Sequence, residues 1–165
     1  MNADAWAEAR LQVRNRKENP RSTLLYNLER REIDGLPVAE FGFPGELRDR
    51  LVALVLEGVK TAGAGLLVEY EEEGNPVPQP GDRSVLVDSG GRGVALLESV
   101  DVRIVRAGDV DEAFARDEGE GFESVADWRA AHERFWGGYR SEPITDDTLV
   151  VCDRFRLVEV FAEPR

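Results

Sequence analysis

The chain has 165 residues, of which 42% are hydrophobic, and its formal net charge is −12. This length fits one domain with a substantial hydrophobic core. The acidic balance argues against unselective binding to long nucleic acids, in which phosphate contacts supply much of the affinity, and leaves a small nucleotide or a local basic groove open.

No stretch approaches the roughly 20 apolar residues that a membrane span needs, and the first residues lack the pattern of a signal peptide. The single cysteine, Cys152, cannot form an internal disulfide and lies in an apolar segment typical of a buried strand. We therefore expect no membrane partner and a location in the reducing cytoplasm. The sequence leaves the oligomeric state open.

The first part of the chain predicts a helical arm. Residues 4–17 have apolar side chains at helical spacing, and Pro20 ends this helix. Residues 21–43 follow no clear period. We therefore divide the chain into an N-terminal helical arm, residues 1–39, and a domain, residues 40–165.

Residues 44–57 form the best-supported predicted helix, because its leucines and valines share one face. It leads into a glycine-rich corner, residues 58–65, where the backbone can approach a ligand closely. Lys60 in this corner is one of two lysines, against nineteen arginines. It is either a solvated cation just past a helix C-terminus or a functional amine, since the pKa of a lysine shifts readily on burial.

Several strands are predicted after the corner, joined by a proline-rich loop and a glycine-rich hairpin turn. They span residues 66–70, 84–88, 94–105 and 148–161. Long strands with short connections indicate a curled antiparallel sheet or a small barrel.

Two further helices are predicted before the last strand. Asp109 and Ser124 each begin a sequence that resembles a helix N-cap box. In the first helix, Glu118 falls on the same stripe as Val110 and Phe114, which faces the protein. A carboxylate on an apolar face needs a partner; alternatively, the helix end frays and Glu118 turns outward.

The second helix presents three aromatic side chains and the only histidine, His132, on one face. A histidine in such a setting is more often a hydrogen-bonded packing residue than a ligand. With one histidine and one cysteine, we expect no metal site, and no cofactor motif is present. A cysteine in an apolar strand is usually inert.

Four segments in a fixed order resemble the ASCH domain family over about residues 40–160. They are Leu-Glu-Gly-Val-Lys-Thr-Ala at 56–62, Val-Asp-Glu-Ala-Phe-Ala-Arg-Asp-Glu-Gly-Glu-Gly at 110–121, Trp-Arg-Ala-Ala-His-Glu-Arg-Phe-Trp at 128–136, and Val-Val-Cys-Asp-Arg-Phe-Arg-Leu-Val at 150–158. The resemblance implies an α+β fold with a PUA-like small β-barrel of mostly antiparallel strands flanked by helices. It also implies a cleft beside the lysine corner.

The resemblance further implies RNA or modified-nucleoside ligands. Some small members of this family hydrolyse the acetyl amide of N4-acetylcytidine, and other members have been described as ribonucleases. The family's Lys and Glu match Lys60 and Glu118, but its Thr position is Gly63 here, and a position that is often Ser is Gly65. We therefore expect little hydrolysis from this chain and a gain from Gly63→Thr.

Three functions remain open at this point. The first is binding of RNA, a nucleotide or a modified nucleoside, with a small nucleotide, nucleoside or short single-stranded RNA as partner and no cofactor. The second is a weak amidohydrolase or ribonuclease that uses Lys60 and Glu118, which we predict to share one cleft. The third is a protein-interaction module. The further candidate ligand-binding residues are Gly58, Thr61, Gly63, Glu69, Tyr70, Trp128, Arg129 and His132.

Overall fold

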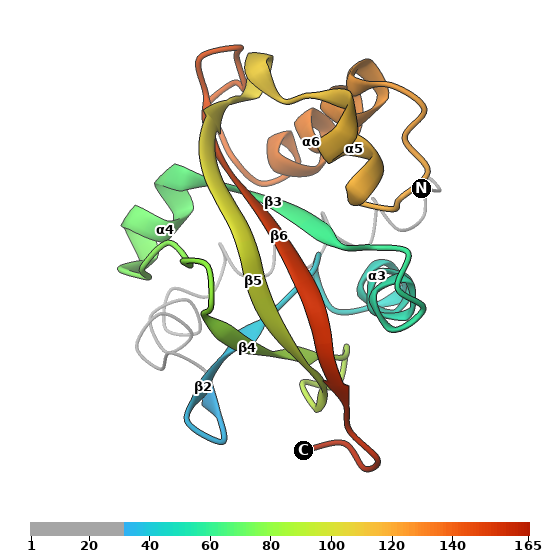
Figure 1. Ribbon diagram of the computed structural model, residues 1–165. Coiled ribbons are helices and arrows are strands. Elements are labelled where there is room, and N and C mark those ends of the chain that lie inside the picture. Colours follow the sequence, from blue (N-terminus) through green and yellow to red (C-terminus); the bar gives the residue numbers. More distant parts are fainter. Residues whose placement is uncertain (1–31) are drawn as a thin grey trace.

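The computed structural model describes residues 32–165, and its sheet is centred on two long strands (Figure 1). β5 (Gly93–Arg106) and β6 (Leu149–Val160) pair antiparallel along most of their length. In the first half of β5, from Gly93 to Ser99, buried residues alternate with more exposed ones, as expected of a pleated sheet. The two longest predicted strands are thus confirmed.

Four shorter strands complete a six-stranded sheet in the order β1-β2-β4-β5-β6-β3. They are β1 (Glu32–Ile33), β2 (Leu36–Ala39), β3 (Ala62–Leu66) and β4 (Arg83–Val87). β2 and β4 are parallel, and the other neighbouring strands are antiparallel. The predicted α+β class is confirmed, but the predicted small barrel is wrong because the sheet stays open. Barrel closure requires the edge strands to bond to each other, whereas β1 and β3 pair with β2 and β6.

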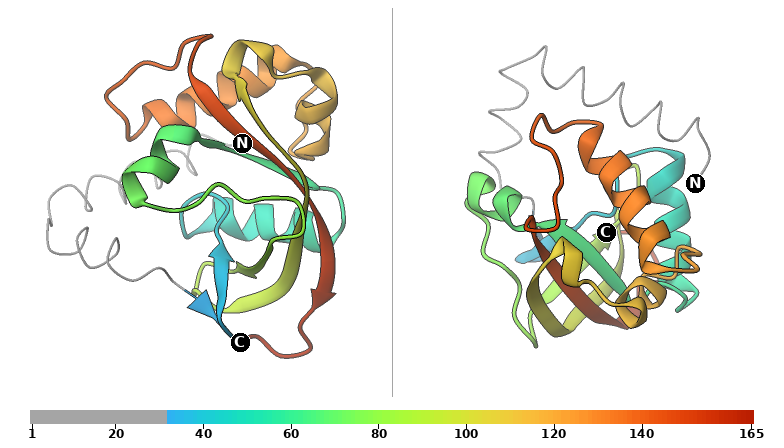
Figure 2. Two further views of the ribbon diagram at one scale, coloured as in Figure 1. Left: turned by 60° about the vertical axis from the view of Figure 1, so that its left-hand side comes forward. Right: turned by 90° about the horizontal axis from the view of Figure 1, so that it is seen from above.

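Helices cover both faces of this sheet (Figures 1 and 2). They are α3 (Glu46–Leu56), α4 (Leu67–Glu73), α5 (Glu112–Asp117) and α6 (Val125–Gly137), with a short 3-10 turn at Ala107–Asp109. On β6, Cys152 packs in the cluster with α5 and α6, and Phe155 packs in the cluster with α3. Within residues 32–165, no helix has the length and apolar character of a membrane span.

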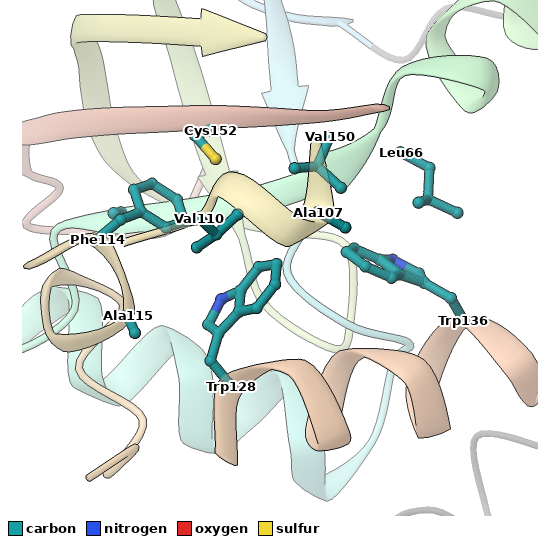
Figure 3. Close-up of a cluster of buried hydrophobic side chains, with 10 residues drawn as sticks. Leu66, Ala107, Val110, Phe114, Ala115, Trp128, Trp136, Val150 and Cys152 are labelled. Atoms are coloured by element: carbon teal, nitrogen blue, oxygen red, sulfur yellow. The ribbon is translucent and has the colours of Figure 1, made fainter. Parts of the chain in front are cut away.

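Two tryptophans of α6 anchor that helix to the sheet (Figure 3). Trp128 and Trp136 are buried in one cluster with Leu66 of β3 and Val150 of β6. Full burial of an aromatic side chain stabilises a fold by about 1.5–3 kcal/mol relative to exposure. The position of α6 against β3 and β6 is therefore strongly determined.

Side-chain caps define where α5 and α6 begin. Ser124 Oγ accepts a hydrogen bond from the Asp127 amide at 3.2 Å, which confirms the predicted N-cap. The predicted cap at Asp109 is wrong: Asp111 caps α5 by accepting from the Phe114 amide at 2.8 Å. Asp109 instead lies in the 3-10 turn that ends β5.

The predicted strand at residues 66–70 is also wrong, because β3 ends at Leu66 and α4 begins at Leu67. Glutamates dominate α4 and have good helix propensity. Gly74 then ends the helix in the left-handed conformation, with φ of 67°, which favours glycine. Gly74 was therefore the sequence feature that favours a short helix over a strand in this segment.

Most of the predicted helical arm, residues 1–39, lies outside the described residues. The described part, residues 32–39, is extended rather than helical. It contributes β1 and β2, and β2 pairs with β4.

Asp153 of β6 is a partly buried carboxylate with an incomplete set of hydrogen-bond partners. Its Oδ2 accepts from Ser99 Oγ at 3.0 Å, and its Oδ1 has no hydrogen-bond partner among the described residues. Burial raises the pKa of Asp153 from 3.8 to about 6. Because the folded-state pKa is raised, bound proton stabilises the fold at low pH, and this stabilisation is lost as the pH rises through about 6.

We expect Asp153→Asn to raise the free energy of unfolding by about 1 kcal/mol at pH 8 and to change it little at pH 4. The full pKa difference corresponds to roughly 3 kcal/mol, and partial exposure reduces it. Urea denaturation at both pH values measures the effect, with Glu71→Gln on the exposed side of α4 as the control. A variant no more stable than the wild type at pH 8 would show that the charge is not destabilising.

Candidate functional site

The glycine-rich corner is tied to the end of α5. The Thr61 amide donates to the Asp117 carbonyl at 2.8 Å, and Thr61 Oγ1 donates to the same carbonyl at 3.2 Å. Just before Thr61, the amides of Val59 and Lys60 both donate to the Leu54 carbonyl of α3. These bonds bring residue 60 beside residue 118, although 58 positions separate them in sequence.

Gly119 lets the two segments approach closely. Its φ is 66°, and a Cβ there would lie 2.3 Å from the Val59 carbonyl oxygen. Any other residue would therefore be strained and would also push the corner away from α5. Close backbone packing at this point brings the Lys60 side chain inward, toward the end of α5.

Lys60 is buried, with 1% of its side chain exposed. Its Nζ donates to Glu120 Oε1 at 2.7 Å and to the Glu118 carbonyl at 3.3 Å, and lies 3.6 Å from Glu118 Oε2. The Phe41 ring centroid is 5.2 Å from Nζ, within the range of a cation–π contact. The predicted proximity of Lys60 and Glu118 is confirmed, and the alternative of a solvated lysine is wrong.

Glu118 is equally buried and is held by α6. Its Oε1 accepts from Trp128 Nε1 at 2.9 Å, and its Oε2 lies 3.4 Å from His132 Nε2. His132 Nδ1 is 2.8 Å from the Trp128 carbonyl, which can only accept. A doubly protonated imidazolium satisfies both contacts. The alternative in which Glu118 turns outward is therefore wrong.

The charges in this cluster support one another. Burial opposes ionisation of Glu118, but His132 and Lys60 outweigh it and hold the pKa of this carboxyl well below its usual range. Burial also opposes the His132 imidazolium, but the Glu118 carboxylate outweighs burial and raises the pKa of His132. The cluster is thus a buried ionic network in which Glu118 and His132 each favour the charged form of the other.

A pocket opens beside this network, with a cavity volume of about 70 Å³. Its charged lining comes from Lys60, Glu118, Glu120 and His132, and its apolar lining includes Phe41, Leu47, Leu51, Phe135 and Trp136. The pocket therefore lies between α3 and α6, which flank β3 in Figure 1. Aromatic walls around a few converging polar groups are typical of small-molecule sites.

The open edge of β3 supplies main-chain groups to the same pocket. β3 is an edge strand, and the Phe155 amide of β6 donates to the Thr61 carbonyl at 2.9 Å. Hydrogen-bonded residues alternate along an antiparallel pair, so the main-chain groups of residues 61, 63 and 65 face β6. Those of Ala64, which lines the pocket, face away from β6 and pair with no other strand among residues 32–165, so they can bond a ligand there.

Arg48 of α3 holds the segment that carries Phe41. Its Nη1 donates to Glu40 Oε1 at 2.9 Å, and its Nη2 donates to the Gly42 carbonyl at 2.8 Å. The Phe41 ring then lies over Gly63, where an added Cβ would meet ring atom Cε1 at 2.8 Å. Gly63 has no positive φ, so the ring, not backbone strain, opposes a side chain here.

The pocket brings together only some of the predicted site residues. Lys60, Gly63, Glu118 and His132 line it, and Trp128 lies behind it with its Nε1 on Glu118. Five others do not line it, namely Gly58, Thr61, Glu69, Tyr70 and Arg129.

Each of these five residues has a structural role outside the pocket. Gly58 makes the turn after α3 with φ of 73°, and Thr61 is bonded to the end of α5. Glu69 is hydrogen-bonded to Tyr139, and the Tyr70 ring packs where Gly65 lacks a side chain. Arg129 pairs with Glu133 and Asp146 and keeps 19% of its side chain exposed.

Sequence reasoning missed two residues that shape the site, Phe41 and Glu120. Phe41 lies in a segment without a regular hydrophobic pattern, so nothing in the local sequence indicated its contact with Lys60. Glu120 did carry a signal, because it stands between Gly119 and Gly121. Both of these glycines have positive φ.

The six-stranded sheet with helices on both faces defines an α+β domain with a pocket between two of its helices. The chain belongs to the ASCH domain family, whose model matches residues 38–159.

Two solved structures are similar to this chain at 28% identity. One, a protein from Enterococcus faecalis V583 described under the family model DUF984, has a TM-score of 0.69 over 79% of this chain and 81% of the other. The second, an ASCH domain from Lactobacillus crispatus JV V101, has a TM-score of 0.65 over 73% of this chain and 77% of the other. No curated protein matches the chain.

Proposed function

We propose that this ASCH domain binds a nucleotide, a modified nucleoside or the end of a short single-stranded RNA, with the base in the pocket beside Lys60. One observation carries the proposal: a buried Lys60–Glu118–His132 network opens onto a pocket with aromatic walls beside β3, an edge strand among the described residues. PUA-like folds are often linked to RNA binding, which agrees with this reading.

The chemistry of a nucleobase matches the three kinds of lining group. Phe41, Phe135 and Trp136 offer ring surface, and base stacking on aromatic side chains contributes roughly 1–3 kcal/mol per base. Lys60, which lines the pocket, offers N–H donors to acceptor atoms of the ligand. The main chain of Ala64 adds a donor and an acceptor of fixed direction.

The hydrolase alternative receives less support from this geometry. A general base works best with a pKa near the working pH, whereas the pKa of Glu118 is held well below its usual range. The Thr61 hydroxyl donates to the Asp117 carbonyl, and position 63 has no hydroxyl. Gly63→Thr alone is not expected to increase hydrolysis, because the Phe41 ring occupies the space that the threonine side chain needs.

Calorimetric titration of the full chain with cytidine, N4-acetylcytidine, cytidine 5′-monophosphate and a short oligonucleotide tests the proposal. We expect at least one of them to bind with a Kd below about 1 mM. Lys60→Met should abolish that binding at a temperature where circular dichroism shows a folded variant. Arg129→Met, which removes a cation outside the pocket, should retain it.

The absence of binding by all four compounds would refute the proposal. Equal binding by the wild type and Lys60→Met would instead place the ligand elsewhere on the domain.

A further inference from the structure

The two carboxylates beside Lys60 are held in different ways. Glu118 has 1% of its side chain exposed and also contacts Trp128 and His132. Glu120 has 11% exposed, and its ion pair with Lys60 is its one salt bridge among the described residues. Glu118 is thus part of the buried framework, whereas Glu120 closes the network on its pocket side.

The backbone around Glu120 suits a side chain that changes position. Gly119 and Gly121 flank it with φ of 66° and 88°. Gly119 is packed against Val59, but a Cβ on Gly121 would have no atom within 4 Å. The segment is therefore anchored on one side of Glu120 and surrounded by open space on the other.

The pocket is small for a base while Glu120 keeps its present position. A cavity of roughly 150 Å³ accommodates benzene, and this pocket has about half that volume. Glu120 lines the pocket, and among the described residues its carboxylate lies closest to Lys60 Nζ, at 2.7 Å. Turning Glu120 outward would enlarge the pocket and remove one negative charge from it.

We propose that Glu120 is a displaceable internal ligand that occupies an oxyanion subsite on Lys60. The natural ligand then carries an anionic oxygen group, such as a phosphate, that replaces the Glu120 carboxylate. This inference rests on the proposed function for the identity of the base, but the subsite itself depends only on Lys60 and Glu120. Glu120 thereby selects phosphorylated ligands over neutral nucleosides, because a neutral group cannot replace its charge on Lys60.

Inorganic phosphate is the probe for the subsite, measured by calorimetric titration of the full chain. Glu120→Gln keeps the side-chain shape and removes the competing charge, so we expect it to bind phosphate about tenfold more tightly than the wild type. Glu123→Gln makes the same change of net charge on an exposed residue nearby and should leave phosphate binding unchanged. Lys60→Met in the Glu120→Gln background should abolish the gain.

Titrations with cytidine 5′-monophosphate and with cytidine show whether the subsite binds the phosphate of a nucleotide or a free oxyanion. A gain on Glu120→Gln for the monophosphate but not for cytidine supports the subsite and assigns it to a nucleotide. A gain for inorganic phosphate alone supports the subsite, assigns it to a free oxyanion, and counts against the base in the proposed function. The inference is overturned if Glu120→Gln binds neither inorganic phosphate nor cytidine 5′-monophosphate more tightly than the wild type does, even where nucleosides bind the wild type.

Glu120→Asp keeps the test decisive if Glu120→Gln does not fold. It retains the charge but shortens the side chain, which withdraws the carboxylate from Lys60. We expect phosphate binding about two- to fivefold tighter than in the wild type. An unchanged Kd in a folded Glu120→Asp variant would overturn the inference.

Discussion

Replacing Lys60 with methionine is expected to lower the free energy of unfolding by about 3 kcal/mol. Methionine fills a similar volume, but it leaves Glu118 and Glu120 without the ammonium that both contact. Breaking a buried pair typically costs about 3–5 kcal/mol. The lower end applies here because His132 still faces Glu118, and Glu120 can turn toward solvent.

Urea denaturation followed by circular dichroism measures this loss. Arg83→Met is the matched control, since it removes a cation from an exposed pair with Glu98 and should change stability by less than about 1 kcal/mol. The double variant Lys60→Met with Glu120→Gln should recover part of the loss, because one unpaired carboxylate is gone. Similar stability of Lys60→Met and Arg83→Met would contradict a buried ionic network.

Truncating Trp128 is expected to have the second large effect, a loss of about 3–5 kcal/mol for Trp128→Ala. The side chain is fully buried between α6 and the sheet, so alanine would leave a large cavity. Trp128→Phe retains most of the ring but removes the donor to Glu118 Oε1. We expect it to cost about 1–3 kcal/mol, the cost of an unsatisfied buried acceptor.

The comparison of the two Trp128 variants separates packing from hydrogen bonding. Unfolding is followed by circular dichroism, because both variants remove a tryptophan and so change the fluorescence signal. Little loss of stability in Trp128→Ala together with lost ligand binding would make Trp128 a ligand contact rather than a core residue. Equal losses in the two variants would show that the hydrogen bond, not the ring volume, dominates.

The sequence predicted the charged pair because helical periodicity is a local property. Glu118 follows Phe114 by four residues and therefore shares its inward face, and the structure buries both. Lys60 was marked by composition and by its glycine-rich corner. The hydrogen bonds of Thr61 to Asp117 then bring these two local features together.

The features that sequence reasoning missed depend on contacts between distant segments. Phe41 reaches Lys60 because Arg48 holds residues 40 and 42, and no period in that segment indicates this. The sheet is open because its edge strands, β1 and β3, do not pair with each other. Hydrophobic alternation along a strand determines which face is buried but not which strands meet. The short helix α4 was missed for a local reason, since the Gly74 cap outweighed the apolar residues at its start.

The most direct test of the Lys60–Glu118–His132 pocket is the nuclear magnetic resonance signal of the His132 imidazole in the full chain. His132 is the only histidine, so its ring resonances report on the pocket without ambiguity. We predict a pKa above the ordinary 6.5 without ligand, and saturable shifts of the ring resonances on titration with cytidine 5′-monophosphate. A His132 pKa at or below 6.5, with ring signals unmoved by a ligand that calorimetry shows to bind, would contradict the account.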